Sequence, residues 1–115
     1  MTGTKNKRFN LTLGGTEYKN CYFKKGEYYD GNTYLGIFRD DEDGDPVPVC
    51  DVTVNMGIKL DKNMAFIKSY SENEGLQESL VNEGFLTPAG KFMKSGYVVI
   101  ELNTLNEKIM EYERD

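Results

Sequence analysis

Apolar and polar residues alternate along several short stretches of the chain, which is the pattern of half-buried β-strands. Residues 9–13 alternate cleanly, and Gly14-Gly15 predicts a hairpin turn into a second strand over 16–24. The alternation breaks near Asn20-Cys21, where we expect a bulge. Further apolar runs bounded by turn residues predict four more strands, over 33–39, 46–55, 64–68 and 97–102.

The spacing changes after residue 70 and becomes helical. Ser71 and Glu74 stand three residues apart, the pattern of a capping box that opens a helix. Leu76 and Leu80 then share one face of that helix, and Gly84 fits the position just past its end. These residues predict a short helix that begins near Ser71.

A second short helix is predicted at the C-terminal end. Thr104 and Glu107 repeat the capping pattern, and one face then carries an apolar stripe of Leu105, Ile109 and Tyr112. Between the helices, residues 85–90 contain Pro88 and are expected to form a loop, with Leu86 and Phe92 as core anchors. The predicted fold is α+β: an antiparallel sheet of about six strands with the two short helices packed on one face.

Length and hydropathy predict one small domain. The chain has 115 residues, and we expect a single domain over 1–115 with residues 1–7 frayed. The sequence contains no run of about 18 apolar residues, so no membrane span is predicted. No apolar stretch follows the basic N-terminus, as a secretory signal would require. We therefore expect a cytoplasmic protein without membrane contact, either a monomer or a dimer.

Residue types that carry common chemistry are scarce. The chain has no histidine, which removes the commonest general base and the commonest zinc ligand. Cys21 and Cys50 lie in strand-like runs and are expected to be free thiols, with a cross-strand disulfide as the alternative. Near Gly90-Lys91 the spacing of a phosphate-binding loop is missing. We therefore expect no cofactor and no catalytic site.

One loop concentrates negative charge. Its five carboxylates, the candidate partner-binding residues, are Asp40, Asp41, Glu42, Asp43 and Asp45. As an EF-hand calcium loop with Gly44 at position six, it would place Arg39 at position one and Cys50 at position twelve, where carboxylates are needed. A solvated hairpin loop, an acidic contact surface and a loose calcium site remain open.

Charge is distributed unevenly along the chain. Residues 1–25 hold six Lys/Arg and one acid, a balance of +5, so the net charge of −5 leaves −10 for the remainder. Such a chain is repelled by nucleic acid as a whole, because phosphate contacts supply most of that affinity. The exception is the N-terminal hairpin, where aromatic residues stand near lysines: Tyr18, Tyr22 and Phe23 lie near Lys19, Lys24 and Lys25. Aromatic residues beside positive charge can stack on single-stranded bases.

Five short motifs occur in order over about two-thirds of the chain, from Thr33 to about Ile109. They are Tyr34-Leu35-Gly36-Ile37, Val52-Thr53-Val54-Asn55, Ala65-Phe66-Ile67, Leu86-Thr87-Pro88-Ala89-Gly90 and Ser95-Gly96-Tyr97. In these motifs the chain resembles a small family of unknown function carried on conjugative elements, plasmids and phages of Firmicutes and Bacteroidetes. That family has no established catalytic residues. The resemblance implies residence on a mobile element, where small acidic proteins often inhibit host defence.

The expected function is that of a non-enzymatic acidic module that binds a larger protein. The leading hypothesis is an inhibitor of a host defence nuclease, of the anti-CRISPR or anti-restriction type, that blocks a basic nucleic-acid-binding surface. The first alternative is an accessory protein of conjugation or plasmid maintenance. The second is a single-strand nucleic-acid binder that uses the basic N-terminal hairpin.

Overall fold

The structure is a computed structural model that describes residues 7–114. Residues 1–6 of the segment expected to fray lie outside this range. Lys7 lies inside it and is ordered by Glu111, whose carbonyl accepts the Lys7 backbone N–H at 3.0 Å and whose carboxylate pairs with the Lys7 ammonium at 2.8 Å. Among the described residues, no helix is long and apolar enough to cross a membrane.

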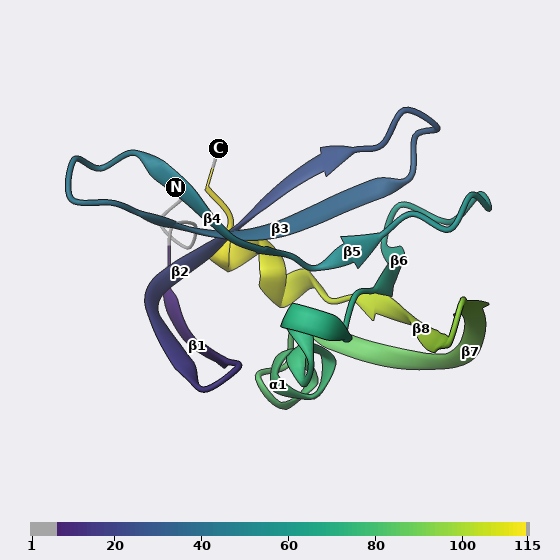
Figure 1. Ribbon diagram of the computed structural model, residues 1–115. Coiled ribbons are helices and arrows are strands. Elements are labelled where there is room, and N and C mark those ends of the chain that lie inside the picture. The colour runs from purple at the N-terminus through teal and green to yellow at the C-terminus, as the bar shows by residue number, and fades with distance from the viewer. Residues whose placement is uncertain (1–6, 115) are drawn as a thin grey trace.

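Strands dominate the described chain, and they form two antiparallel sheets of four strands each, in the orders β1-β2-β3-β4 and β5-β6-β8-β7 (Figure 1). The elements are β1 (Phe9–Leu13), β2 (Thr16–Glu27), β3 (Thr33–Asp40), β4 (Pro46–Asp51), β5 (Thr53–Val54), β6 (Met64–Ile67), η1 (Ser71–Asn73), α1 (Leu76–Asn82), β7 (Leu86–Ser95), β8 (Val98–Leu105) and η2 (Glu107–Tyr112). The mixed α+β class is therefore confirmed. The expectation of one sheet of about six strands is wrong.

The single strand predicted over 46–55 is divided at Val52, and this division separates the two sheets. The Val52 backbone N–H donates to the carbonyl of Leu35 in the first sheet at 2.9 Å. Its carbonyl accepts from the backbone N–H of Lys68, just past β6 in the second sheet, at 2.8 Å. Alternation of apolar residues continues through this point, so periodicity alone could not show that the strand changes sheets.

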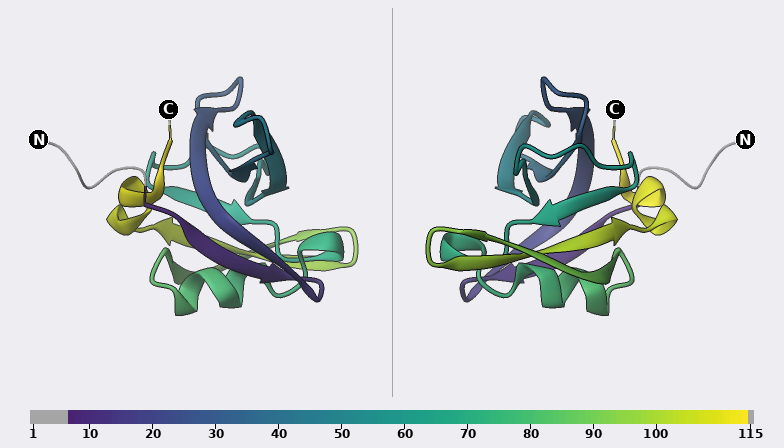
Figure 2. Two further views of the ribbon diagram at one scale, coloured as in Figure 1. Left: turned by 90° about the vertical axis from the view of Figure 1, so that its left-hand side faces the viewer. Right: turned by 90° about the vertical axis from the view of Figure 1, so that its right-hand side faces the viewer.

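The helices also lie differently from the expectation. Instead of covering one face of a sheet, α1 contacts both β1 and β7, the edge strands of the two sheets, while the 3₁₀ helix η2 packs on β2 (Figure 2). The sheets are thus joined through Val52 on one side and bridged by α1 on the other. The main core fills the space that these elements enclose.

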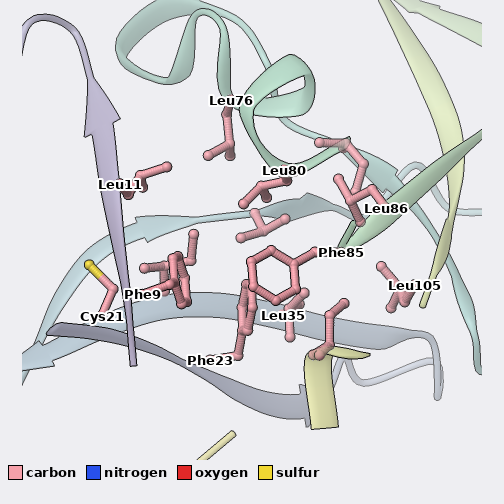
Figure 3. Close-up of a cluster of buried hydrophobic side chains, with 14 of the residues drawn as sticks. Phe9, Leu11, Cys21, Phe23, Leu35, Leu76, Leu80, Phe85, Leu86 and Leu105 are labelled. Carbon is pink, nitrogen blue, oxygen red and sulfur yellow. The ribbon is translucent and has the colours of Figure 1, made fainter. Parts of the chain in front are cut away.

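Three phenyl rings form the centre of the core. Ring centroids of Phe9, Phe23 and Phe85 lie 4.9 to 5.1 Å apart, and Figure 3 shows Leu76 and Leu80 of α1 above them. Burying each such side chain contributes about 1.5–3 kcal/mol. The two leucines were predicted to share one face of a helix, which is confirmed, and the structure shows that this face is buried.

The predicted helix starts fail in the same way at both places. Ser71 has a left-handed φ of 55° inside the 3₁₀ turn η1, and α1 begins only after Gly75, without a side-chain cap. Thr104 belongs to β8 and pairs with Thr87 of β7, so it does not cap a helix. The predicted C-terminal helix is the 3₁₀ helix η2, again without a side-chain cap, although it buries Ile109 as expected.

Glycine and bulge signals were more accurate. Gly84, with φ of 85°, follows α1, and the Phe85 backbone N–H bonds back to the Leu80 carbonyl at 2.9 Å. The predicted bulge near Asn20 is confirmed by a shift of register between β1 and β2, with Asn20 at φ of 59°. A left-handed residue is the normal way to end a helix or to insert a bulge.

The loop expected over 85–90 is wrong, because residues 86–90 belong to β7 and only Phe85 lies outside a strand. A bulge lies between Pro88 and Phe92, and the strand sits at the edge of its sheet. An edge strand tolerates proline because one row of its N–H groups has no partner strand. Of the two expected core anchors, Leu86 is buried and Phe92 is 58% exposed.

Candidate functional site

The acidic loop forms the tip of the β3–β4 hairpin, which projects to one side of the molecule (Figure 1). The Asp41 carboxylate accepts the backbone N–H groups of Asp43 and Asp45, both at 2.9 Å. The Asp41 backbone N–H bonds to the Asp45 carbonyl at 2.9 Å, and Gly44 donates to the Asp41 carbonyl at 3.0 Å. Four hydrogen bonds therefore fix the loop, and Asp41 is committed to holding it.

Asp40 differs from the other predicted site residues because it has a cationic partner. It ends β3, and its carboxylate accepts the Tyr22 hydroxyl at 2.8 Å and pairs with the guanidinium of Arg114. The Tyr22 hydrogen bond first, and then Arg114, hold the Asp40 pKa below its ordinary value of 3.8. Arg114 neutralises this carboxylate, so Asp40 belongs to the base of the hairpin.

Three carboxylates remain free for a partner. Glu42, Asp43 and Asp45 are exposed at the tip, and none of them forms an ion pair with any residue of the range 7–114. The loop surrounds a shallow polar hollow whose lining includes Arg39 and Asp43. The structure thus brings the five predicted residues together but assigns them three different roles.

The acidic side chains and the two cysteines show what metal or thiol chemistry the described residues can support. No cluster of three or more Cys, Asp or Glu side chains in residues 7–114 is arranged to hold a metal ion. Cys21 and Cys50 are free thiols, as expected. Burial raises their pKa values to about 11 and about 12, so both stay protonated and poorly nucleophilic near neutral pH.

The basic N-terminal hairpin lacks the aromatic surface that base stacking would need. Tyr22 and Phe23 are completely buried, and only Tyr18 is partly exposed. One nearby lysine, Lys25, lies 3.4 Å from the carboxylate of Glu113. Burial therefore removes two of the three aromatic residues considered as a stacking platform, since Phe23 packs in the main core and the Tyr22 ring lies under Arg8 and Arg114.

Sequence reasoning missed two groups of side chains. The first is Tyr22 with Arg114, which hold Asp40 from a distance of many residues in sequence. The second lies on the β7–β8 hairpin, where Phe92 and Val99 are more than half exposed. Hydropathy carried no signal for this surface, because Phe92 and Met93 are adjacent apolar residues and only the folded strand shows which of them is exposed.

No protein-family model, curated protein or solved structure matches the chain. The resemblance to a mobile-element family therefore stays a prediction.

Proposed function

We propose that the protein is a non-enzymatic binding module that uses the Asp41–Asp45 loop to occupy a basic, nucleic-acid-binding surface of a larger protein. The observation that carries this proposal is the set of three exposed carboxylates, Glu42, Asp43 and Asp45, on a hydrogen-bonded loop without cationic partners among residues 7–114. The most specific form of the proposal is an inhibitor of a host CRISPR or restriction nuclease.

The physical argument is electrostatic complementarity. Surfaces that bind nucleic acid carry Lys and Arg placed for phosphates, and carboxylates on a fixed loop can take the same positions. The hydrogen bonds around Asp41 order the loop before binding, which lowers the entropy lost in the complex. The biological setting comes from the resemblance of residues 33–109 to a family found on conjugative elements, plasmids and phages.

The test is inhibition of DNA cleavage by a panel of purified CRISPR and restriction nucleases. The loop variant carries Glu42→Gln, Asp43→Asn and Asp45→Asn, and it keeps Asp41 so that the loop retains its hydrogen bonds. If each exposed ion pair contributes about 0.5 kcal/mol, the variant inhibits about tenfold less well. Inhibition by the parent protein should also weaken with added salt.

A matched control removes the same charge elsewhere. Glu17, Glu83 and Glu107 are exposed and lie outside the loop, so their replacement by glutamine should leave inhibition within about twofold. Equal loss in both triple variants would mean that net charge acts rather than the loop. Inhibition of no nuclease in the panel would exclude the specific form of the proposal.

A further inference from the structure

A groove separates the β7–β8 hairpin from the start of α1, on a surface different from the acidic loop. Phe92 and Val99 line it on the hairpin side, and Tyr70 and Gln77 line the other side. Its volume is about 190 Å³. An apolar cavity of about 150 Å³ holds a benzene ring, so this groove has room for one large side chain.

The hairpin wall of the groove exposes apolar surface. Phe92 is 58% and Val99 is 59% exposed, and both lie on the end of the β7–β8 hairpin that extends beyond the residues of β8 paired with β6. Phe92 pairs in register with Glu101, and paired residues of neighbouring strands point to the same face. The aromatic ring and the carboxylate therefore stand side by side in the groove.

Glu101 is oriented from both sides of the groove. One carboxylate oxygen accepts the Gln77 side-chain amide at 2.8 Å, and the other accepts the Gly90 backbone N–H at 3.3 Å. Gln77 is itself fixed, because its side-chain oxygen accepts the side-chain amide of buried Asn103 at 3.3 Å. This chain of hydrogen bonds holds the Glu101 carboxylate in place.

The two carboxylates of the groove lack an ion-pair partner within the described chain, although the Lys68 ammonium lies 5.9 Å from the centroid of the lining Tyr70 ring. Glu101 is partly buried, Glu78 is an exposed lining residue, and neither forms an ion pair with any residue between 7 and 114. Two hydrogen bonds leave a carboxylate with unused acceptor positions. Lys94 pairs with Val99 in register but does not line the groove.

We propose that this groove binds an arginine side chain of a partner protein. A guanidinium is planar, so it can stack on the exposed ring of Phe92 while its N–H groups pair with a carboxylate such as Glu101. A lysine ammonium would pair with Glu101 but would lose the planar stacking. An uncharged apolar side chain would leave the partly buried carboxylate without a counter-ion. The inference does not rest on the function proposed for the acidic loop.

The test is an NMR titration of the ¹⁵N-labelled protein with the peptide acetyl-Ala-Arg-Ala-amide. Saturable shifts are expected at the backbone amides of Gly90, Phe92, Val99 and Glu101, with a dissociation constant of about 1–10 mM. The peptide with citrulline in place of arginine keeps the shape without the charge, and it should bind at least about fivefold more weakly. Equal binding of the two peptides would overturn the proposal.

Two variants locate the contact. Glu101→Gln removes the charge and keeps an acceptor for Gln77, and Phe92→Ser removes an exposed ring without opening the core. Each variant should bind the arginine peptide about fivefold more weakly than the parent protein, whereas Asp43→Asn should bind it with unchanged affinity. Shifts confined to residues 41–45, or unchanged affinity in Glu101→Gln, would exclude this groove and leave the test of the acidic loop unaffected.

Discussion

Neighbouring carboxylates of the β3–β4 hairpin carry the same formal charge and have different surroundings. Asp40 is paired with Arg114 and Tyr22, while Asp41 accepts backbone N–H groups within the loop. Asp43 and the other tip residues face solvent. A run of acids in a sequence therefore says little about how many of them can meet a partner.

The pairing of Asp40 predicts an acid-dependent loss of stability. Its folded-state pKa is lowered, so its stabilising contribution is complete above the unfolded value of 3.8 and is lost as pH falls through the folded value. Urea unfolding at pH 6 and near pH 3 measures this. The parent protein should lose more free energy of unfolding than Asp40→Asn, whose amide does not titrate.

Equal losses in the two proteins would show that the charge of Asp40 does not stabilise the folded protein. Asp43→Asn is the control, since Asp43 is exposed and has no cationic partner among residues 7–114. It should follow the parent protein closely at both pH values.

The sequence predicted the position of the acidic loop, including all five carboxylates. It could not predict which of them are free, because Arg114 lies 74 residues from Asp40 along the chain. Local spacing carries no information on a contact of that range. The groove between the β7–β8 hairpin and α1 was missed for the same reason, since Tyr70 and Gln77 meet Phe92 only in the folded protein.

At the scale of elements, glycine predicted the end of a helix better than capping boxes predicted where helices begin. Both predicted capping boxes fail, whereas Gly84 ends α1 as predicted. A capping box needs only two polar residues three apart, a spacing that is frequent in an acidic chain. A left-handed position is far more selective, because a Cβ atom is disfavoured there.

Gly84 gives a prediction at this scale. With φ of 85°, Gly84→Ala should lower the free energy of unfolding by about 1–2 kcal/mol, measured by urea denaturation. An added Cβ would meet only the Lys108 side chain, at 3.5 Å, so backbone strain rather than a clash should dominate. The matched control is Gly26→Ala, where φ is not positive and the new Cβ would have an ordinary contact of 3.6 Å with Tyr34. A loss as large in the control would contradict this explanation.

Strands were predicted well wherever alternation and turn glycines agreed, as in 9–13 and 33–39. The segment 86–95 was missed because Pro88 and Gly90 are typical of loops. Its position at a sheet edge makes both residues acceptable, and edge position is a tertiary property.

At the scale of the whole molecule, Val52 joins the two sheets through its backbone. Val52→Pro removes the N–H that bonds to Leu35 and leaves a buried carbonyl without its donor, which costs about 1–3 kcal/mol in addition to lost packing. Because the same residue serves both sheets, hydrogen exchange should accelerate in both together. Unfolding should remain a single transition.

Val52→Ala is the companion variant because it keeps the backbone N–H. It should lose only about 1.5 kcal/mol, the contribution of two buried methyl groups. Faster exchange limited to one sheet in Val52→Pro would mean that the sheets unfold separately. That result would also remove the reason for treating the described chain as one cooperative unit.

The C-terminal end of the described chain lies at the foot of the acidic hairpin. Lys7 is bonded to Glu111, and Arg114 is bonded to Asp40, the residue directly before the loop. A domain fused close behind Arg114 would therefore begin next to Asp40 and compete with a partner for the space around the acidic hairpin. When the protein is immobilised as bait for a partner of the loop, it is therefore better tethered through a surface residue far from Asp40 than through the segment that follows Arg114.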